Sequence, residues 1–121
     1  MVRYFFLKIS SFFNLHPFVY EYFGRLLHFY LIALKDYLLK LAEITRMEVL
    51  SGPFAYSAHD IGFGGWIHWK TSGTSFYSYP TSPPLFTVDC YTCKPFSAKE
   101  AAEFTRKYFN ASDLVWKEVE V

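Results

Sequence analysis

Residues able to do chemistry gather in one segment of this chain, between Gly64 and Cys93. Within it, Ser72 supplies a hydroxyl, Cys90 and Cys93 supply thiols, and His68 supplies an imidazole. A hydroxyl or a thiol becomes a nucleophile or a proton donor when a neighbouring group helps to move its proton. We therefore expect any chemistry of this protein to lie in this segment.

Cys90 and Cys93 form a single Cys-x-x-Cys pair. In thiol–disulfide proteins this motif opens a helix, where the two sulfur atoms can approach each other. Here the first cysteine lies in a predicted strand, in which residues three apart point to opposite faces. The pattern therefore favours two separate cysteines over a redox pair.

Other common functional motifs are missing from the sequence. The histidines at positions 16, 28, 59 and 68 lack the paired spacing of metal ligands, so no metal site is expected. The run Gly62-Phe63-Gly64-Gly65 precedes a predicted strand, whereas phosphate-binding loops lead into a helix. The net charge of +1 gives no reason to expect nucleic acid or a membrane surface as a partner.

The chain is expected to form one domain over its 121 residues, positions 1–121. Hydrophobic residues make up 52% and charged residues 19%, a balance that excludes a disordered chain. Aromatic residues reach 22%, more than a body of this size can bury, so we expect a covered partner surface and a homodimer. The absence of Gln and the scarcity of Asn hint at a thermophilic source.

The sequence predicts a cytoplasmic protein without a targeting or membrane segment. The apolar stretch 1–13 is interrupted by Lys8, and no small-residue cleavage site follows it. The longest uncharged run of the long predicted helix covers residues 26–34, far short of the roughly 20 residues that span a bilayer.

The pattern of apolar residues predicts the order β-α-β-β-β-β-α-β. Strands are expected at 2–10, 47–56, 64–71, 74–79, 85–92 and 114–121, and helices at 17–45 and 97–110. The fold class is α+β, a two-layer sandwich in which two helices cover one face of an antiparallel sheet. Because both faces of the central strands are apolar, the second face needs another cover, and a second copy is the simplest one.

Local signals refine this plan. Leu34, Leu38 and Leu41 belong to the apolar stripe of the long helix, and Ser97 opens a capping box at the second helix. A turn is expected at Ser72-Gly73. The second predicted strand should be interrupted near Gly52-Pro53.

A family resemblance joins these pieces. Residues 64–80, GGWIHWKTSGTSFYSYP, and residues 88–93, VDCYTC, resemble the small prokaryotic S-adenosylmethionine decarboxylases. That family carries a strand ending in Glu-Ser-His, a following strand ending in an aromatic-Pro pair, and a Val/Leu-Asp-x-aromatic-Thr-Cys motif. The flanking elements fit as well, so the resemblance spans nearly the whole chain.

The resemblance implies a self-processing proenzyme. In such proteins a Ser hydroxyl attacks the preceding carbonyl, the ester eliminates, and a pyruvoyl group remains as the cofactor that accepts electrons during decarboxylation. By position, Ser72 takes the pyruvoyl-forming place and Cys93 the place of the proton donor to the substrate. A His and a second Ser assist processing in the family.

Several positions depart from the family pattern. Thr71 replaces the usual Glu, and Gly73 replaces the following His. Tyr77 stands at the processing-His position, and Gly64 at the place of the second Ser. Tyr has a pKa near 10 and relays protons less easily than an imidazole, so His68 on the preceding strand is the candidate substitute.

Two classes of function therefore stay open. The first is pyruvoyl-dependent decarboxylation of S-adenosylmethionine for spermidine synthesis, or of a related amino acid such as arginine. The second is a non-catalytic member of the fold, a ligand-binding module or dimer partner without a cofactor. In that case Ser72 marks a hairpin turn, Cys93 caps a strand and Tyr77 is a core or interface ring.

Overall fold

The computed structural model describes residues 3–9, 23–58, 62–79 and 85–120, with side chains described from residue 30 onward. The elements are β1 (Arg3–Ile9), α2 (Phe23–Ile44), β2 (Val49–Ser57), β3 (Phe63–Trp69), β4 (Ser72–Tyr79), β5 (Leu85–Thr92), α3 (Ala98–Phe109) and β6 (Leu114–Glu120). This order confirms the prediction. The expected start of the first helix at residue 17 lies outside the described residues.

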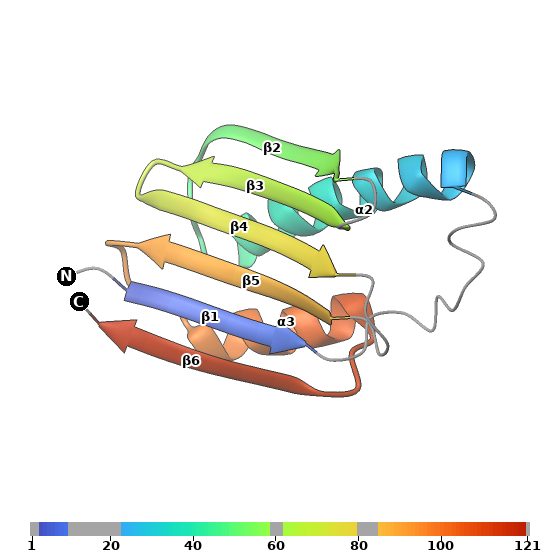
Figure 1. Ribbon diagram of the computed structural model, residues 1–121. Coiled ribbons are helices and arrows are strands. Elements are labelled where there is room, and N and C mark those ends of the chain that lie inside the picture. The colour runs from blue at the N-terminus through green and yellow to red at the C-terminus, as the bar shows by residue number, and fades with distance from the viewer. Residues whose placement is uncertain (1–2, 10–22, 59–61, 80–84, 121) are drawn as a thin grey trace.

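The strands form one antiparallel sheet in the order β2-β3-β4-β5-β1-β6. Figure 1 shows both helices behind the sheet and no helix in front of it. The predicted α+β sandwich, with two helices on one face, is therefore confirmed. We call the sheet face without helices the open face.

The core lies between the helices and the sheet. Leu34, Leu38 and Leu41 are buried on α2, as their spacing of three and four residues predicts. Tyr37 lies within the same stripe and is completely buried. Its ring stacks on Phe104 at 5.8 Å between centroids and contacts Phe109 at 4.6 Å.

Helix α3 begins and ends where the sequence predicts. The Ser97 hydroxyl accepts the N–H of Glu100 at 3.2 Å, which satisfies one of the open amides of the first turn. Asn110 closes the helix with a left-handed φ of +48°. Ala98, Ala101 and Ala102 are buried, and such small side chains let the helix lie close to the sheet.

Strand β2 runs through the predicted interruption. The register with β3 shifts between Val49 and Ser51 and again between Ser51 and Phe54. Gly52 lies within the shifted stretch and has a φ of +96°, a conformation that favours glycine. The expected break at Gly52-Pro53 is therefore a bulged part of one continuous strand.

The turn between β3 and β4 is not where the Ser-Gly signal placed it. Trp69 pairs with Ser72, so the turn is formed by Lys70 and Thr71. A turn at Ser72-Gly73 would put Phe76 opposite Trp69. The observed register puts Phe76 opposite Gly65, and the Leu34 side chain of α2 occupies the space that a side chain at position 65 would need.

No helix within the described ranges is long and apolar enough to cross a membrane. Helix α2 is the longest described, and the ion pair between Asp36 and Lys40, 2.9 Å apart, lies on it.

The buried hydroxyls of Tyr37 and Thr105 generate the first prediction. Their oxygen atoms lie 2.9 Å apart, and Thr105 Oγ1 donates to Ala101 O at 2.7 Å, so Tyr37 donates to Thr105. Thr105→Val strands the Tyr37 hydroxyl and should lower the free energy of unfolding by about 1–3 kcal/mol. Tyr37→Phe should cost less, about 1 kcal/mol, because Thr105 keeps its other bond. Urea unfolding measures both, and equal costs would contradict the prediction.

Candidate functional site

The β3–β4 turn and the end of β5 meet at one peptide group, the peptide between Thr71 and Ser72. The N–H of Cys93 donates to Thr71 O at 3.3 Å, and Cys93 Sγ lies 3.6 Å from the same oxygen. The structure therefore brings together the residues at the pyruvoyl-forming and proton-donor positions. Ser72 also pairs with Thr92 across the β4–β5 ladder.

The backbone of Ser72 is strained. Its φ is +137°, in a region that side chains other than glycine rarely adopt. Such conformations cost about 1–3 kcal/mol each and persist only where the surrounding structure holds them. The strain is therefore located at the residue that the resemblance places at the pyruvoyl-forming position.

A compact set of contacts surrounds this peptide. Thr92 Oγ1 lies 3.3 Å from Thr71 Oγ1 and accepts the N–H of Lys94 at 3.0 Å. Thr71 Oγ1 in turn lies 3.4 Å from Met47 Sδ. Sequence reasoning assigned no role to Thr92 or Met47. Thr92 belongs to the quoted motif, whereas no local signal connects Met47 to the site.

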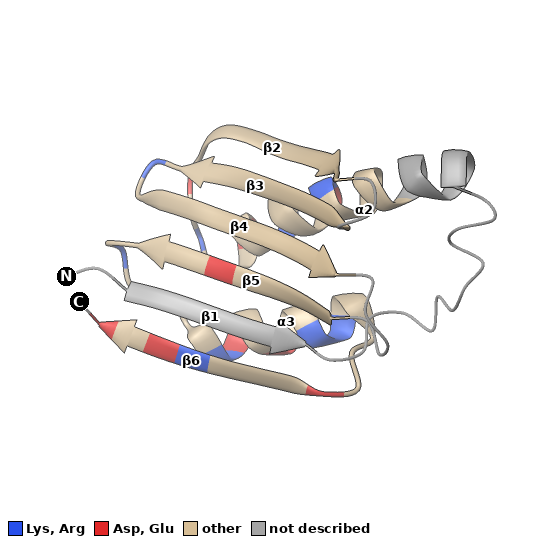
Figure 2. Cartoon of the chain, in the orientation of Figure 1, with Lys and Arg blue, Asp and Glu red and all other residues tan. Residues whose placement is uncertain are grey.

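Basic side chains gather around the turn. Lys94 Nζ donates to Arg46 O at 2.6 Å, which ties the end of β5 to the segment after α2. Lys70 forms an exposed ion pair with Glu48 at 3.6 Å. Figure 2 shows these cationic positions at the end of the sheet that carries the β3–β4 turn.

The two cysteines have different surroundings. Cys93 is exposed, whereas Cys90 is buried on the helix-covered face. Burial raises the pKa of the Cys90 thiol to about 12, and Thr74 Oγ1 donates to its sulfur at 3.3 Å. Cys93 is therefore the thiol that solvent and ligands can reach.

His68 lies on the open face beside the turn. It pairs with Gly73, the residue after Ser72. Its ring lies 4.4 Å from that of Trp66, which in turn lies 4.3 Å from that of Phe54. His68 is thus the described imidazole closest to Ser72 in the strand register.

Tyr77 lies at a different place from Ser72. The two residues are five positions apart on β4, which is about 17 Å along an extended strand. Tyr77 instead shares a row with Gly64 on β3 and Tyr56 on β2. The residues at the two processing positions are thus neighbours of each other and not of Ser72 within one chain.

Tyr56 fills the space above Gly64. A Cβ atom at residue 64 would overlap with the ring and the hydroxyl of Tyr56. Partial burial, and then the neighbouring Tyr77 with its hydrogen bond, raise the pKa of Tyr56 above its ordinary value. Sequence reasoning missed Tyr56, because only the cross-strand register brings it to this row.

Gly73 is also enforced by its surroundings. A Cβ atom at this position would lie 2.5 Å from Ile67 O, a backbone atom that cannot move aside easily. A side chain at position 73, such as the histidine that the resemblance implies, therefore has no room in this structure.

The open face carries one acidic group on β2 to β5, Asp89 (Figure 2). It is half-buried, and burial raises the pKa of its carboxyl. Aromatic side chains dominate the surrounding strands on this face.

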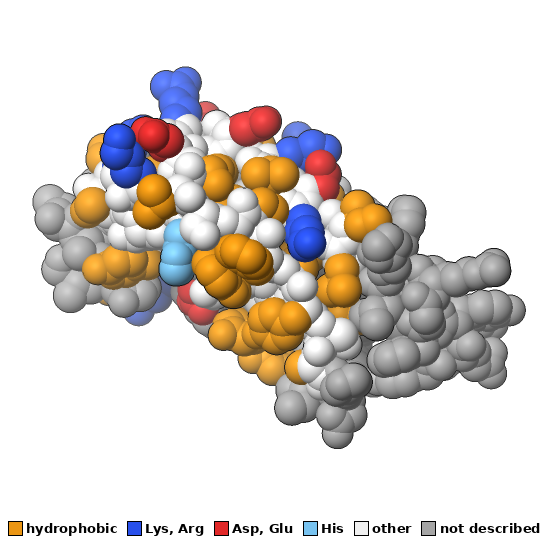
Figure 3. All heavy atoms as spheres, turned by 90° about the horizontal axis from the view of Figure 1, so that it is seen from above, with side chains coloured by type: hydrophobic (Ala, Val, Ile, Leu, Met, Phe, Trp, Pro, Cys, Tyr) orange, Lys and Arg blue, Asp and Glu red, His pale blue; other side chains and the backbone are white. Residues whose placement is uncertain are grey.

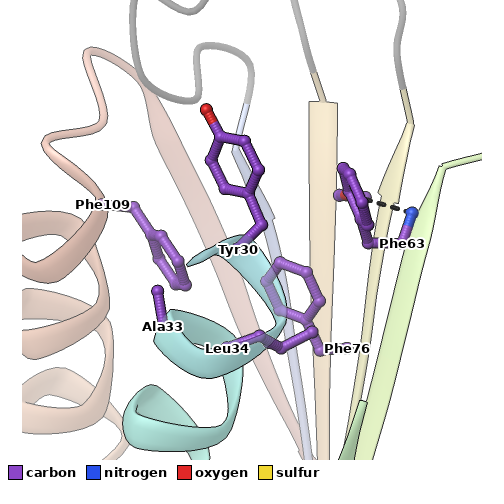
Figure 4. A pocket seen from close by; sticks show the side chains of 7 residues that line it. Tyr30, Ala33, Leu34, Phe63, Phe76 and Phe109 are labelled. Atoms are coloured by element: carbon purple, nitrogen blue, oxygen red, sulfur yellow. Dashed lines mark hydrogen bonds between the residues drawn. The ribbon is translucent and has the colours of Figure 1, made fainter. Parts of the chain in front are cut away.

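A small hollow on the helix side is not part of this site. Tyr30, Leu34, Phe63, Phe76 and Phe109 point into it, and Phe63 N–H donates to Ser78 Oγ at 3.3 Å (Figure 4). Its 20 Å³ holds about one water. Phe63 and Ser78 lie at the far end of the β3–β4 hairpin from Thr71, so the hollow is remote from the Thr71–Ser72 peptide.

Comparison with solved structures identifies the fold. The crystal structure of the adenosylmethionine decarboxylase from Aquifex aeolicus VF5 superimposes with a TM-score of 0.70. The match covers 99% of this chain and 89% of that chain, at 17% sequence identity. The two proteins therefore share the same fold.

The sequence then defines the family. Residues 31–120 match the family model described as S-adenosylmethionine decarboxylase. The chain therefore belongs to the S-adenosylmethionine decarboxylase family, which confirms the resemblance. Comparison with curated proteins gives no match.

The contact between Tyr56 and Gly64 generates the second prediction. Gly64→Ser should lower the free energy of unfolding by about 1–3 kcal/mol, because the new side chain overlaps with the Tyr56 ring. The double variant Tyr56→Ala/Gly64→Ser should lose less than the sum of the two single variants. Urea unfolding of all four proteins measures this coupling. Losses that add within about 0.5 kcal/mol would show that the two residues do not compete for space.

Proposed function

We propose that this chain is an S-adenosylmethionine decarboxylase-type protein of spermidine synthesis, with its reactive centre at Thr71, Ser72 and Cys93. One observation carries the proposal: the Cys93 N–H and Sγ both contact the carbonyl of the Thr71–Ser72 peptide. This is the carbonyl that the Ser72 hydroxyl would attack. The oxyanion formed by that attack would accept a hydrogen bond from the Cys93 N–H, which is already directed at this oxygen.

In the proposed processing, the Ser72 hydroxyl cleaves the peptide bond that precedes it. Ser72 Oγ bonds to the Thr71 carbonyl carbon, the peptide C–N bond breaks, and the hydroxyl proton passes to the released amine. A base then removes the α-proton of residue 72, and elimination of the ester frees the Thr71 carboxylate and leaves a dehydroalanine. One water molecule hydrolyses this residue, which releases ammonia and leaves the pyruvoyl group. That group, when formed, supplies the electron sink for decarboxylation. Cys93 is proposed to hold the proton that the substrate carbon receives.

We also propose that self-cleavage is inefficient. Gly64 offers no hydroxyl, and Tyr77 is a weak base near neutral pH. Losing one assisting group typically costs a factor of about 10² to 10⁴ in rate. His68, beside Gly73 in the register, is the proposed substitute base. The strain at Ser72 favours cleavage but does not provide a proton acceptor.

A homodimer is part of the proposal. The helices leave the open face uncovered, and its exposed hydrophobic side chains include Phe54, Tyr77, Tyr79 and Tyr91. Hydrophobic side chains continue over β2, seen from above in Figure 3. Since Tyr77 and Ser72 are about 17 Å apart along one strand, they could act together only across two copies. A second copy packed on the open face would cover its hydrophobic side chains and could bring Tyr77 of one copy near Ser72 of the other.

The third prediction concerns cleavage. Denaturing mass spectrometry of freshly purified protein should show a single chain of 14.2 kDa. Tyr77→His should introduce cleavage between Thr71 and Ser72, with a pyruvoyl mass on the C-terminal fragment. In that background Cys93→Ala should keep cleavage and lower release of labelled carbon dioxide from S-adenosylmethionine by roughly 10² or more.

Two results would contradict parts of this proposal. Rapid cleavage of the unmodified chain would refute inefficient processing and would favour an active decarboxylase over a non-catalytic member of the fold. A Tyr77→His variant that neither cleaves nor releases carbon dioxide would refute the decarboxylase assignment.

The fourth prediction concerns assembly. Sedimentation at micromolar concentration should give about twice the chain mass of 14.2 kDa. Tyr91→Lys on the open face should shift the protein toward the single-chain mass, because a charge would be buried in the interface. Leu39→Lys on α2, at a similarly exposed position, is the matched control and should leave the mass unchanged. A single-chain mass for the unmodified protein would refute the dimer.

A further inference from the structure

The hydroxyl of Thr92 lies at the junction of three segments around Cys93. Thr92 is completely buried at the end of β5. Its Oγ1 lies 3.3 Å from Thr71 Oγ1 in the β3–β4 turn and 3.9 Å from Met47 Sδ after α2, and it accepts the N–H of Lys94. The processing and decarboxylation chemistry described above gives this residue no task.

The contacts of Thr92 bracket the contact between Cys93 and Thr71. A threonine hydroxyl donates one hydrogen bond and accepts up to two. It accepts the N–H of Lys94, the residue directly after Cys93, and it donates toward Thr71, the residue directly before Ser72. The buried Thr92 hydroxyl therefore connects the β3–β4 turn at Thr71 to the chain after β5 at Lys94. These are the two segments that carry the contact between Cys93 and the Thr71 carbonyl.

The side chain at position 71 makes this arrangement specific to the present sequence. Thr71 Oγ1 lies within reach of both Thr92 Oγ1 and Met47 Sδ, so two short hydroxyl side chains and one thioether form a compact polar contact beneath the turn. A side chain without a hydroxyl at position 92 would leave the Lys94 amide without this acceptor. The turn and the end of β5 would then lose their direct side-chain connection.

We propose that Thr92 is a positioning residue of the reactive centre. Its hydroxyl holds the β3–β4 turn and the chain after β5 in the arrangement in which Cys93 contacts the Thr71 carbonyl. The catalytic meaning of this arrangement rests on the proposed function. The positioning itself is a property of the folded chain and is measurable without any turnover.

The test uses the reactivity of Cys93 in the full-length native protein. Iodoacetamide labels accessible thiols, and mass spectrometry of the intact chain and of its peptides gives the rate at each cysteine. Because Cys90 is buried and burial raises its pKa to about 12, labelling of the native protein reports on Cys93. The variants are Thr92→Val, which removes the hydroxyl, and Thr92→Ser, which keeps it.

Thr74→Val is the matched control. Thr74 is also a buried strand threonine, but its hydroxyl donates to a sulfur atom within the sheet, that of Cys90, and not to the β3–β4 turn. In Thr92→Val, iodoacetamide should label Cys93 roughly three- to tenfold faster than in the unmodified protein. The reason is that the thiol proton is no longer held at the Thr71 carbonyl. Thr92→Ser and Thr74→Val should stay within about twofold of the unmodified protein.

Several outcomes would overturn the proposal. A Thr92→Val rate that is unchanged, slower, or matched by Thr74→Val would show that the hydroxyl does not position Cys93. A Thr92→Ser rate as fast as that of Thr92→Val would show the same. If Thr92→Val lacks a cooperative unfolding transition, Thr71→Val at the half-exposed turn takes its place, with an expected increase of roughly two- to threefold.

The cleavage assay separates this proposal from the proposed function. In the Tyr77→His background, Thr92→Val should slow cleavage between Thr71 and Ser72, whereas Thr74→Val should not. If that background does not cleave, the decarboxylase assignment fails and the labelling rates still decide the role of Thr92. If it cleaves equally with Val at position 92, the assignment stands and the positioning role fails.

Discussion

The register of β4 between its two neighbours is the constraint on which the rest of the structure depends. Pairing of Phe76 with Gly65 on one side and Val88 on the other sends the apolar side chains toward the helices. A slip of one residue would turn them to the opposite face. The same register sets Ser72 against Thr92, so the packing of the core and the geometry of the Thr71–Ser72 peptide have a single origin.

Much of the fold could be predicted because its signals are local. The order of elements, the buried leucines of α2 and the Ser97 cap each follow from residues within a few positions of one another. The turn was predicted incorrectly because Ser72-Gly73 is a strong local signal, whereas the true turn follows from which residue faces Gly65 across the hairpin. The partner of the buried Tyr37 hydroxyl could not be predicted, because Thr105 lies 68 positions away along the chain.

The candidate site was predictable in part for the same reason. Ser72 and Cys93 stood out through residue type and motif, but their meeting depends on a long-range strand pairing. Met47 and Tyr56 have neither chemistry nor spacing that marks them, and only the assembled sheet brings them to the Thr71 turn and to Gly64. Residues that support a site from another helix or strand carry no local sequence signal by which they could be predicted.

The glycine at position 73 limits which substitutions the β3–β4 hairpin can accept. Backbone oxygen from Ile67 occupies the volume that a side chain there would need, and this oxygen belongs to the hairpin itself. A side chain at position 73 would therefore require the backbone of the β3–β4 hairpin to move. The hairpin and the residue at position 73 can change only together, because the atom in the way is main chain and has no rotamer to adopt.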